Sequence, residues 1–202
     1  MHTLRFPVIV TLSLFFVACS SIDTTGISPQ SSKAPRGPEV SAVTLTEFAD
    51  LQCPACKAAH TLLTKPLLEK YGSKIRFEYV QFPLQSIHAY AYKAALASEC
   101  AADQGKFWEY LDLNYEKQEE LPTAPYEAWA QSLGLNADLF HRCLASGIKG
   151  DAIDADIARG NALKVNSTPS YFVNGVRVDS NTMEALSFAI DSAFVRAANT
   201  PL

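Results

Sequence analysis

The sequence lacks runs of like charge and, after its first twenty residues, any long apolar segment. Its 202 residues include 17 Lys and Arg against 21 Asp and Glu, a formal net charge of −4. No block rich in Lys and Arg stands out, so a nucleic-acid partner is not expected. No later segment approaches the ~20 apolar residues of a membrane-spanning helix, which excludes a multi-pass membrane protein. A hydrophobic content of 48% also excludes a disordered chain.

The first residues have the proportions of a secretory signal. Arg5 precedes an apolar run from Phe6 to Ala18, too short for a membrane span of ~20 residues. Phe16-Val17-Ala18-Cys19 resembles a bacterial lipobox, although that site usually carries Leu where Phe16 stands. The resemblance implies a signal peptide over 1–18 and a lipid on Cys19. The alternative is an ordinary signal peptide that is cut nearby.

The next stretch, 19–42, is rich in Ser, Thr, Pro and Gly. A segment of this composition has little apolar surface to bury and is not expected to fold by itself. We therefore expect a flexible tether over 19–42, followed by a folded domain over 43–199.

Besides Cys19, the chain has four cysteines, and export favours disulfides over zinc. Cys53 and Cys56 are close enough in sequence to form one pair. Cys100 and Cys143 remain, and both lie in apolar helical surroundings. We interpret them as a structural disulfide between two packed helices; the alternative is two small buried thiols.

The apolar pattern of the domain predicts an α/β protein. Asn174-Gly175 is the strongest hairpin signal, and Pro66 is expected to kink the first helix. The expected elements are a strand over 43–48, a helix from Cys53 to about Gly72, a strand over 74–82, helices within about 87–158, hairpin strands over 170–173 and 176–178, and a closing helix over about 182–198.

Cys53-Pro54-Ala55-Cys56 begins a predicted helix directly after a predicted strand. At the helix N-terminus, Cys53 lies near free backbone N–H groups and the positive end of the helix dipole, which favour its thiolate. The thiolate is the attacking species in disulfide exchange, and Cys56, one turn later, would resolve the mixed disulfide. The alternative is a tight structural bridge.

Thr168-Pro169 lies directly before the predicted strand over 170–173. Proline has no N–H to donate to the hydrogen-bond ladder of a sheet, so it is unfavourable at the entry to a central strand. A cis Thr168–Pro169 bond in a tight turn would explain it. The alternative is a trans proline that caps an edge strand.

Together these elements resemble the DsbA-like branch of the thioredoxin superfamily. The segments that carry the resemblance are 47–56, 103–108 and 171–175. It implies a thioredoxin fold with a helical insertion domain between the second and third strands. It also implies that Cys53 is the nucleophile, Cys56 the resolving thiol, and Pro169 a cis residue facing them. Thr168 would offer its backbone to an extended substrate, and Glu47 would help to move the proton of Cys56.

One residue departs from the pattern: Ala55 stands where the best-known oxidants carry His, so a very strongly oxidising potential is not assured. We expect an exported thiol–disulfide oxidoreductase that introduces disulfides into proteins and needs no cofactor. Its partners would be exported proteins with cysteines and a membrane redox partner, in the periplasm or outside the cell. The alternatives are a reductase or isomerase kept reduced by a membrane partner, or a copper-handling or chaperone-like module, for which His60 could join the two cysteines.

Overall fold

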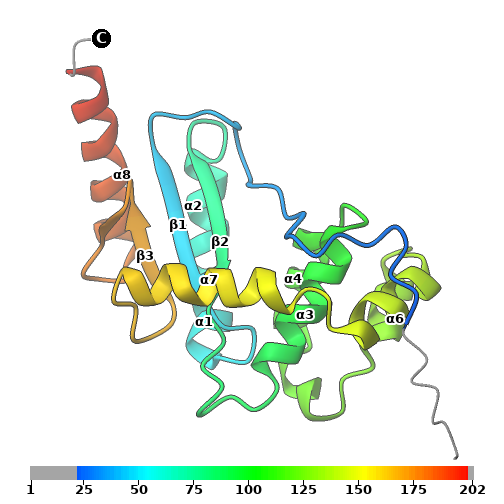
Figure 1. Ribbon diagram of the computed structural model, residues 1–202. Coiled ribbons are helices and arrows are strands. Elements are labelled where there is room, and N and C mark those ends of the chain that lie inside the picture. The colour runs from blue at the N-terminus through cyan, green and yellow to red at the C-terminus, as the bar shows by residue number, and fades with distance from the viewer. Residues whose placement is uncertain (1–21, 200–202) are drawn as a thin grey trace, which may run out of the picture.

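The computed structural model describes residues 22–199, which form an α/β fold (Figure 1). In chain order the elements are β1 (Thr44–Ala49), α1 (Pro54–Ala59), η1 (His60–Thr64), α2 (Lys65–Tyr71), β2 (Arg76–Gln81), α3 (Ala91–Ala102), α4 (Phe107–Glu116), η2 (Gln118–Thr123), α5 (Tyr126–Ser132), α6 (Ala137–Ser146), α7 (Gly150–Ala162), β3 (Ser170–Val173), β4 (Val176–Arg177) and α8 (Met183–Ala198). The predicted order of strands and helices is confirmed.

The four strands form one sheet in the order β2-β1-β3-β4. β1 pairs parallel to β2 and antiparallel to β3, and β3 turns back into β4. Asn174 and Gly175 make that turn with φ angles of 49° and 78°. Positive φ at both central residues is what a two-residue hairpin turn requires, and it explains Asn-Gly here.

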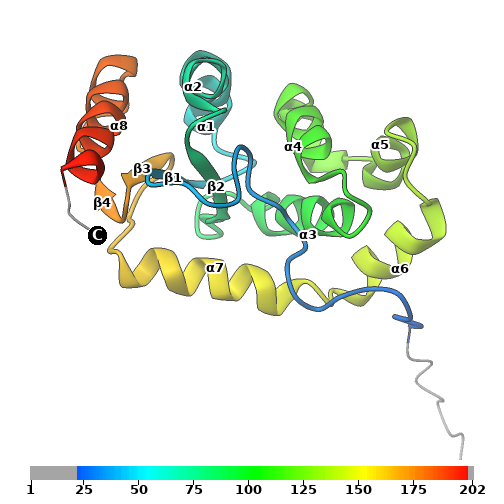
Figure 2. The same ribbon diagram turned by 90° about the horizontal axis from the view of Figure 1, so that it is seen from above.

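Helices cover both faces of the sheet (Figure 2). α1, α2 and α8 lie on one face, where Leu67 and Ile190 pack on Leu45 and Phe77. α7 crosses the other face. Gly160 allows this close approach, because a Cβ there would lie 2.4 Å from the Phe82 ring. β1 is therefore almost fully buried, and its C-terminal end leads into the segment that carries the cysteines.

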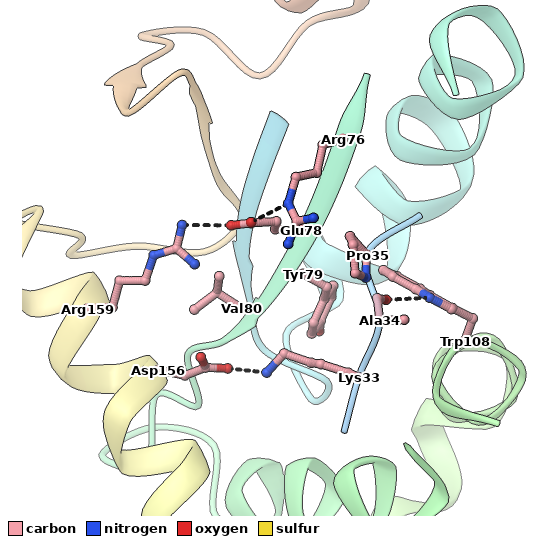
Figure 3. A pocket seen from close by; sticks show the side chains of 10 residues that line it. All are labelled: Lys33, Ala34, Pro35, Arg76, Glu78, Tyr79, Val80, Trp108, Asp156 and Arg159. Atoms are coloured by element: carbon pink, nitrogen blue, oxygen red, sulfur yellow. Dashed lines mark hydrogen bonds and ion pairs between the residues drawn. The ribbon is translucent and has the colours of Figure 1, made fainter. Parts of the chain in front are cut away.

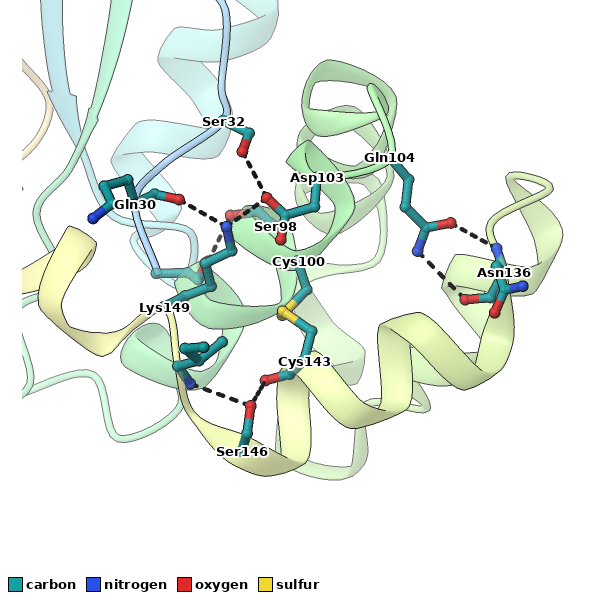
Figure 4. The surroundings of a disulfide bond; sticks show 12 residues. Gln30, Ser32, Ser98, Cys100, Asp103, Gln104, Asn136, Cys143, Ser146 and Lys149 are labelled. Carbon is teal, nitrogen blue, oxygen red and sulfur yellow. Dashed lines mark hydrogen bonds and ion pairs between the residues drawn. A yellow bond between two sulfur atoms is a disulfide. The ribbon is translucent and has the colours of Figure 1, made fainter. Parts of the chain in front are cut away.

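The helices α3 to α6 form the predicted insertion, and their apolar core continues to Tyr79 of β2 and to Cys53 and Cys56. Cys100 of α3 and Cys143 of α6 are joined by a disulfide with an S–S distance of 2.02 Å (Figure 4). The bond closes a loop of 43 residues. In the chain-entropy model, a loop of this size contributes ~4 kcal/mol to stability. The disulfide is thus a major constraint on the insertion.

Residues 22–42, the described part of the expected flexible tether, pack against the folded domain instead. This part lies along the insertion domain and the edge of β2 (Figure 1). Ile27 is buried in the core of the insertion, Trp108 donates to the Ala34 carbonyl at 3.1 Å, and Arg36 exchanges backbone hydrogen bonds with Phe77 at 3.0 and 2.9 Å.

Specific partners, which composition does not reveal, hold this segment in place. Lys33 forms ion pairs with Glu99 of α3 and with Asp156 of α7, and Figure 3 shows the second of these. The Lys149 ammonium donates to the Gln30 carbonyl at 2.8 Å. These bonds offset the cost of ordering a Ser- and Pro-rich chain. We call residues 22–36 the strap.

Candidate active site

Cys53 occupies the N-cap of α1, at the end of the turn that follows β1. Its φ and ψ of −71° and 120° are extended, and Pro54 takes the first helical position. The Cys53 N–H donates to the Asp50 carbonyl at 3.1 Å, and its own carbonyl accepts from the Lys57 N–H at 3.1 Å. The sulfur therefore lies at the open end of the helix, where backbone N–H groups have no helical partner.

The residues just before β3 lie next to this sulfur. The Thr168–Pro169 peptide bond is cis, and the Cys53 thiol donates to the Thr168 carbonyl at 3.5 Å. The structure thus brings Cys53, Cys56, Thr168 and Pro169 together, although the two pairs are more than a hundred residues apart in sequence.

The two cysteines are thiols in very different electrostatic environments. A hydrogen bond from the Cys56 thiol, helped by Thr168 and the N–H groups of Cys56 and Ala55, lowers the pKa of Cys53 to about 5. Burial, together with the neighbouring Cys53 sulfur, raises the pKa of Cys56 far above its usual range. At neutral pH Cys53 is therefore a thiolate while Cys56 holds a proton, which is the division that disulfide exchange requires.

Asp50 fixes the turn between β1 and α1. Its carboxylate accepts hydrogen bonds from the N–H groups of Gln52 at 2.7 Å and Leu84 at 2.8 Å, and it contacts His88 Nδ1 at 2.7 Å. Its own N–H donates to the Cys56 sulfur at 3.5 Å. No sequence pattern assigns His88 a role; in the structure it joins the loop after β2 to this turn.

Gln118 also contacts the turn, and sequence reasoning missed it. Its side-chain amide donates to the carbonyls of Leu51 at 2.9 Å and Cys53 at 3.1 Å. No sequence signal marked Gln118, because these partners lie 67 and 65 residues away.

Glu47 is buried in β1, with 1% of its surface exposed. Its two oxygens contact the Thr64 hydroxyl at 3.0 Å and the Tyr171 hydroxyl at 3.1 Å, and these hydroxyls lie 2.8 Å from each other. Only a protonated Glu47 supplies a hydrogen for each side of this triangle. Burial raises the pKa of Glu47 to about 7, and the hydrogen bonds from Thr64 and Tyr171, which lower this pKa, offset burial only in part.

The same buried region contains three tyrosines, Tyr79, Tyr115 and Tyr171. Burial, with added effects from Cys56 and Glu47, raises the pKa of all three well above the ordinary value. Glu47 and Cys56 thus both raise the pKa values of the same three tyrosines. The hydrogen bonds of Glu47, however, go to Thr64 and Tyr171 rather than to Cys56.

Two hollows flank the cysteines. One, of about 340 Å³, is lined mainly by apolar residues: Ala55, Ala58, Ala59, Leu62, Leu63, Pro169 and Asn181. Leu62 is 69% exposed on its wall. The other, of about 260 Å³, has a more polar lining: Gln52, Pro54, His88, Gln118, Glu119, Leu121 and Pro122. An extended peptide at Thr168 would therefore meet surfaces of different polarity.

His60 turns to the insertion domain. It lies in a single π-helical turn, η1, just before Pro66, where the sequence predicted a kink. Its Nε2 is 2.6 Å from an Asp112 oxygen, and its ring lies 4.8 Å from that of Tyr115. Within residues 22–199, no group of three or more His, Cys, Asp or Glu side chains is placed to hold a metal ion.

Cys19 and the predicted signal peptide lie outside the described residues. Among the helices of residues 22–199, none combines the length and apolar character needed to cross a bilayer.

Comparison with known proteins agrees with this geometry. A family model described as Thioredoxin matches residues 31–192. Among curated proteins, the chain is 40% identical over 167 residues to Na(+)/H(+) antiporter NhaA 3 of Salinispora tropica and 39% identical over 160 residues to NhaA 1 of Salinispora arenicola. These matches cover 82% and 79% of this chain but only 25% and 24% of the antiporters. The chain thus spans about a quarter of the length of these relatives.

Solved structures share the fold. BdbD from Bacillus subtilis, in its oxidised form, has a TM-score of 0.70 at 20% identity, over 81% of this chain and 94% of that one. Wolbachia pipientis alpha-DsbA1 has 0.69 at 20% identity, over 81% and 92%. A thioredoxin-like oxidoreductase from Silicibacter pomeroyi has 0.68 at 22% identity, over 87% and 99%. The chain therefore belongs to the thioredoxin family and has the DsbA-like form of its fold.

Proposed function

We propose that this protein is an exported thiol–disulfide oxidoreductase that introduces disulfides into other proteins through Cys53 and Cys56. The observation that carries the proposal is the opposed ionisation of the two thiols, with the pKa of Cys53 lowered to about 5 and that of Cys56 raised. A stabilised thiolate favours the dithiol form, so the disulfide form tends to take electrons from a client.

The reaction follows from the positions of the groups. A client thiolate attacks the Cys53 sulfur of the Cys53–Cys56 disulfide, a mixed disulfide forms, and Cys56 leaves and takes up a proton. A second thiolate of the same client then attacks the client sulfur of the mixed disulfide, and Cys53 leaves as the thiolate that its surroundings stabilise. The client loses two electrons and the protein gains them. A membrane redox partner would then remove them.

Three residues support these steps. We assign the Thr168 backbone, beside the cis Pro169, to pairing with an extended client; the contact between its carbonyl and the Cys53 sulfur at 3.5 Å supports this assignment. Glu47, with its pKa raised to about 7, can gain or lose a proton in the pH range of the reaction. We assign it the transfer of the Cys56 proton through the buried cluster.

The direction of electron flow is tested by the reduction potential of the Cys53–Cys56 pair. The domain is equilibrated with glutathione buffers, and the fraction of dithiol is measured. We expect a value closer to the ~−120 mV of DsbA than to the ~−270 mV of thioredoxin, because the Cys53 thiolate is strongly stabilised. Ala55 helps to stabilise the Cys53 thiolate only through its backbone N–H, so we expect a reduction potential less oxidising than that of DsbA.

A value near that of thioredoxin would instead support the reductase or isomerase alternative. The absence of any reversible two-electron couple would overturn the proposal. For the copper-handling alternative, residues 22–199 offer no supporting contact, since His60 contacts Asp112 there.

We further propose that the chain is anchored to the outer face of a membrane through a lipid on Cys19. The lipobox-like residues 16–19 support this, and the curated relatives carry the name of membrane antiporters. Because Arg142 of α6 holds the strap through the Asp23 carbonyl at 2.8 Å, a lipid on Cys19 would lie at most about 11 Å of extended chain from Ile22. The insertion domain would then stay close to the bilayer.

The anchor is tested by expressing the full chain and its Cys19→Ala variant in a bacterium. The wild-type chain is expected in the membrane fraction, with a mature N-terminus at Cys19 whose mass includes the acyl groups. The variant is expected in the soluble fraction. A wild-type chain without lipid, or a variant that stays in the membrane, would contradict the anchor and leave the redox proposal untouched.

A further inference from the structure

The helical insertion reaches the redox centre through Gln118, the first residue of η2. Its side chain is buried, with only 5% of the residue exposed. The amide nitrogen donates to two carbonyls of the turn that presents the nucleophile, Leu51 at 2.9 Å and Cys53 at 3.1 Å. Both hydrogens of the amide therefore have an acceptor within the turn.

The two carbonyls flank the residue that precedes the nucleophile. Holding them fixes the Leu51–Gln52 and Cys53–Pro54 peptide planes, and so restrains the extended conformation of Cys53 at the N-cap. That conformation directs the sulfur to Thr168 and to the N–H groups of Ala55 and Cys56. The Cys53 carbonyl also accepts from the Lys57 N–H, so Gln118 links the turn to the first turn of the helix.

The other contacts of this turn come from different directions. Asp50 holds the Gln52 N–H at 2.7 Å, and the Tyr90 N–H donates to the Gln52 side chain at 2.7 Å. Neither of them bonds the carbonyls of Leu51 or Cys53. Without Gln118, the carbonyls of Leu51 and Cys53 would lose this buried donor, and the turn that holds the Cys53 sulfur in place would be less constrained.

We propose that Gln118 is a positioning residue for disulfide exchange, by which the helical insertion holds the nucleophile's turn in the geometry that stabilises the thiolate. The inference rests on the proposed function and adds to it a role for the insertion. Stabilising the Cys53 thiolate favours the dithiol form of the protein and makes Cys53 a better leaving group from the mixed disulfide. Gln118 thus makes the protein a stronger oxidant.

The test replaces Gln118 by Met, which has a similar length and no donor. A matched control is Gln104→Met, because Gln104 also clamps backbone, with 2.7 and 3.4 Å bonds to Asn136, at the far side of the insertion (Figure 4). The pKa of Cys53 is followed by thiolate absorbance in the reduced proteins. The equilibrium with glutathione is measured on the same samples.

For Gln118→Met we expect the pKa of Cys53 to rise by roughly half a unit to one unit, because about one hydrogen bond's worth of stabilisation is lost. The equilibrium constant for oxidising glutathione should fall by about threefold to tenfold. Gln104→Met should lower thermal stability to a similar degree and leave both redox quantities unchanged. If Gln118→Met does not fold, Gln118→Asn keeps the amide but is too short to reach both carbonyls, and it should shift the same quantities in the same direction.

Three outcomes would overturn the inference: redox values equal to those of the wild type in the folded Gln118 variant, equal shifts in the Gln104 control, or a shift of opposite sign. A wild-type protein without any exchange with glutathione would instead overturn the proposed function itself. The two failures are therefore distinguishable.

Discussion

Cys56→Ser is expected to accumulate as a stable mixed disulfide with client proteins, joined through Cys53. In the variant the Cys53 thiolate attacks a disulfide of an oxidised client and releases one client thiol, and no Cys56 thiol is present to displace the client from the resulting mixed disulfide. Cys53→Ser is expected to reduce disulfide formation to the level of buffer alone, because Cys56 is fully buried and its pKa is raised, which leaves no accessible thiolate. Trapped species are measured by non-reducing electrophoresis and mass spectrometry.

The control for this experiment is the double variant Cys53→Ser and Cys56→Ser, which should trap nothing. Its Cys100–Cys143 disulfide is intact, so any remaining adduct would come from Cys19 or from the structural cysteines, and peptide mapping would tell which. Trapping through the single Cys53→Ser variant, or none through Cys56→Ser, would contradict the assignment of the nucleophile.

Glu47→Gln is expected to stabilise the protein at alkaline pH. Burial raises the pKa of Glu47 from 4.5 to about 7. Between these values the folded state binds a proton that the unfolded state has released, so the free energy of unfolding falls as pH rises. The favourable contribution of the protonated form is complete below pH 4.5 and is lost by the time pH passes 7. Gln removes this loss and is expected to gain about 3 kcal/mol at pH 8.5.

The hydrogen bonds of the site can survive this change. A Gln amide can donate to Thr64, whose hydroxyl can donate to Tyr171, whose hydroxyl can return a hydrogen bond to the Gln oxygen. The triangle of 3.0, 2.8 and 3.1 Å contacts is therefore kept. A smaller side chain such as Ala would add a cavity and obscure the effect of charge.

The measurement is urea unfolding from pH 4 to pH 9, on the oxidised protein so that Cys53 and Cys56 do not titrate. The wild type should lose stability relative to Glu47→Gln as pH rises, and the two curves should meet near pH 4. Parallel curves over the whole range would show that Glu47 has an ordinary pKa in the folded state.

Local patterns in the sequence determined much of this protein. Segments of alternating apolar and polar residues, an Asn-Gly turn and a proline after Cys53 predicted the order of the elements. Such patterns suffice because backbone conformation and side-chain period are local properties. The motif at 53–56 predicted the redox pair for the same reason, since a helix N-terminus acts on whichever residue occupies it. The pairing of Cys100 with Cys143 followed from elimination among few cysteines.

Only the tertiary structure decided what reaches that pair from elsewhere. Gln118 and His88 are ordinary polar residues in sequence, and they acquire a role only because folding places them beside the turn from Asp50 to Cys53. The prediction of a flexible tether was wrong for the strap for the same reason. Composition measures what a segment can bury by itself, whereas Ile27 and Lys33 are held by a core and by carboxylates that other segments supply. Contacts between distant segments depend on the whole fold, so no local pattern records them.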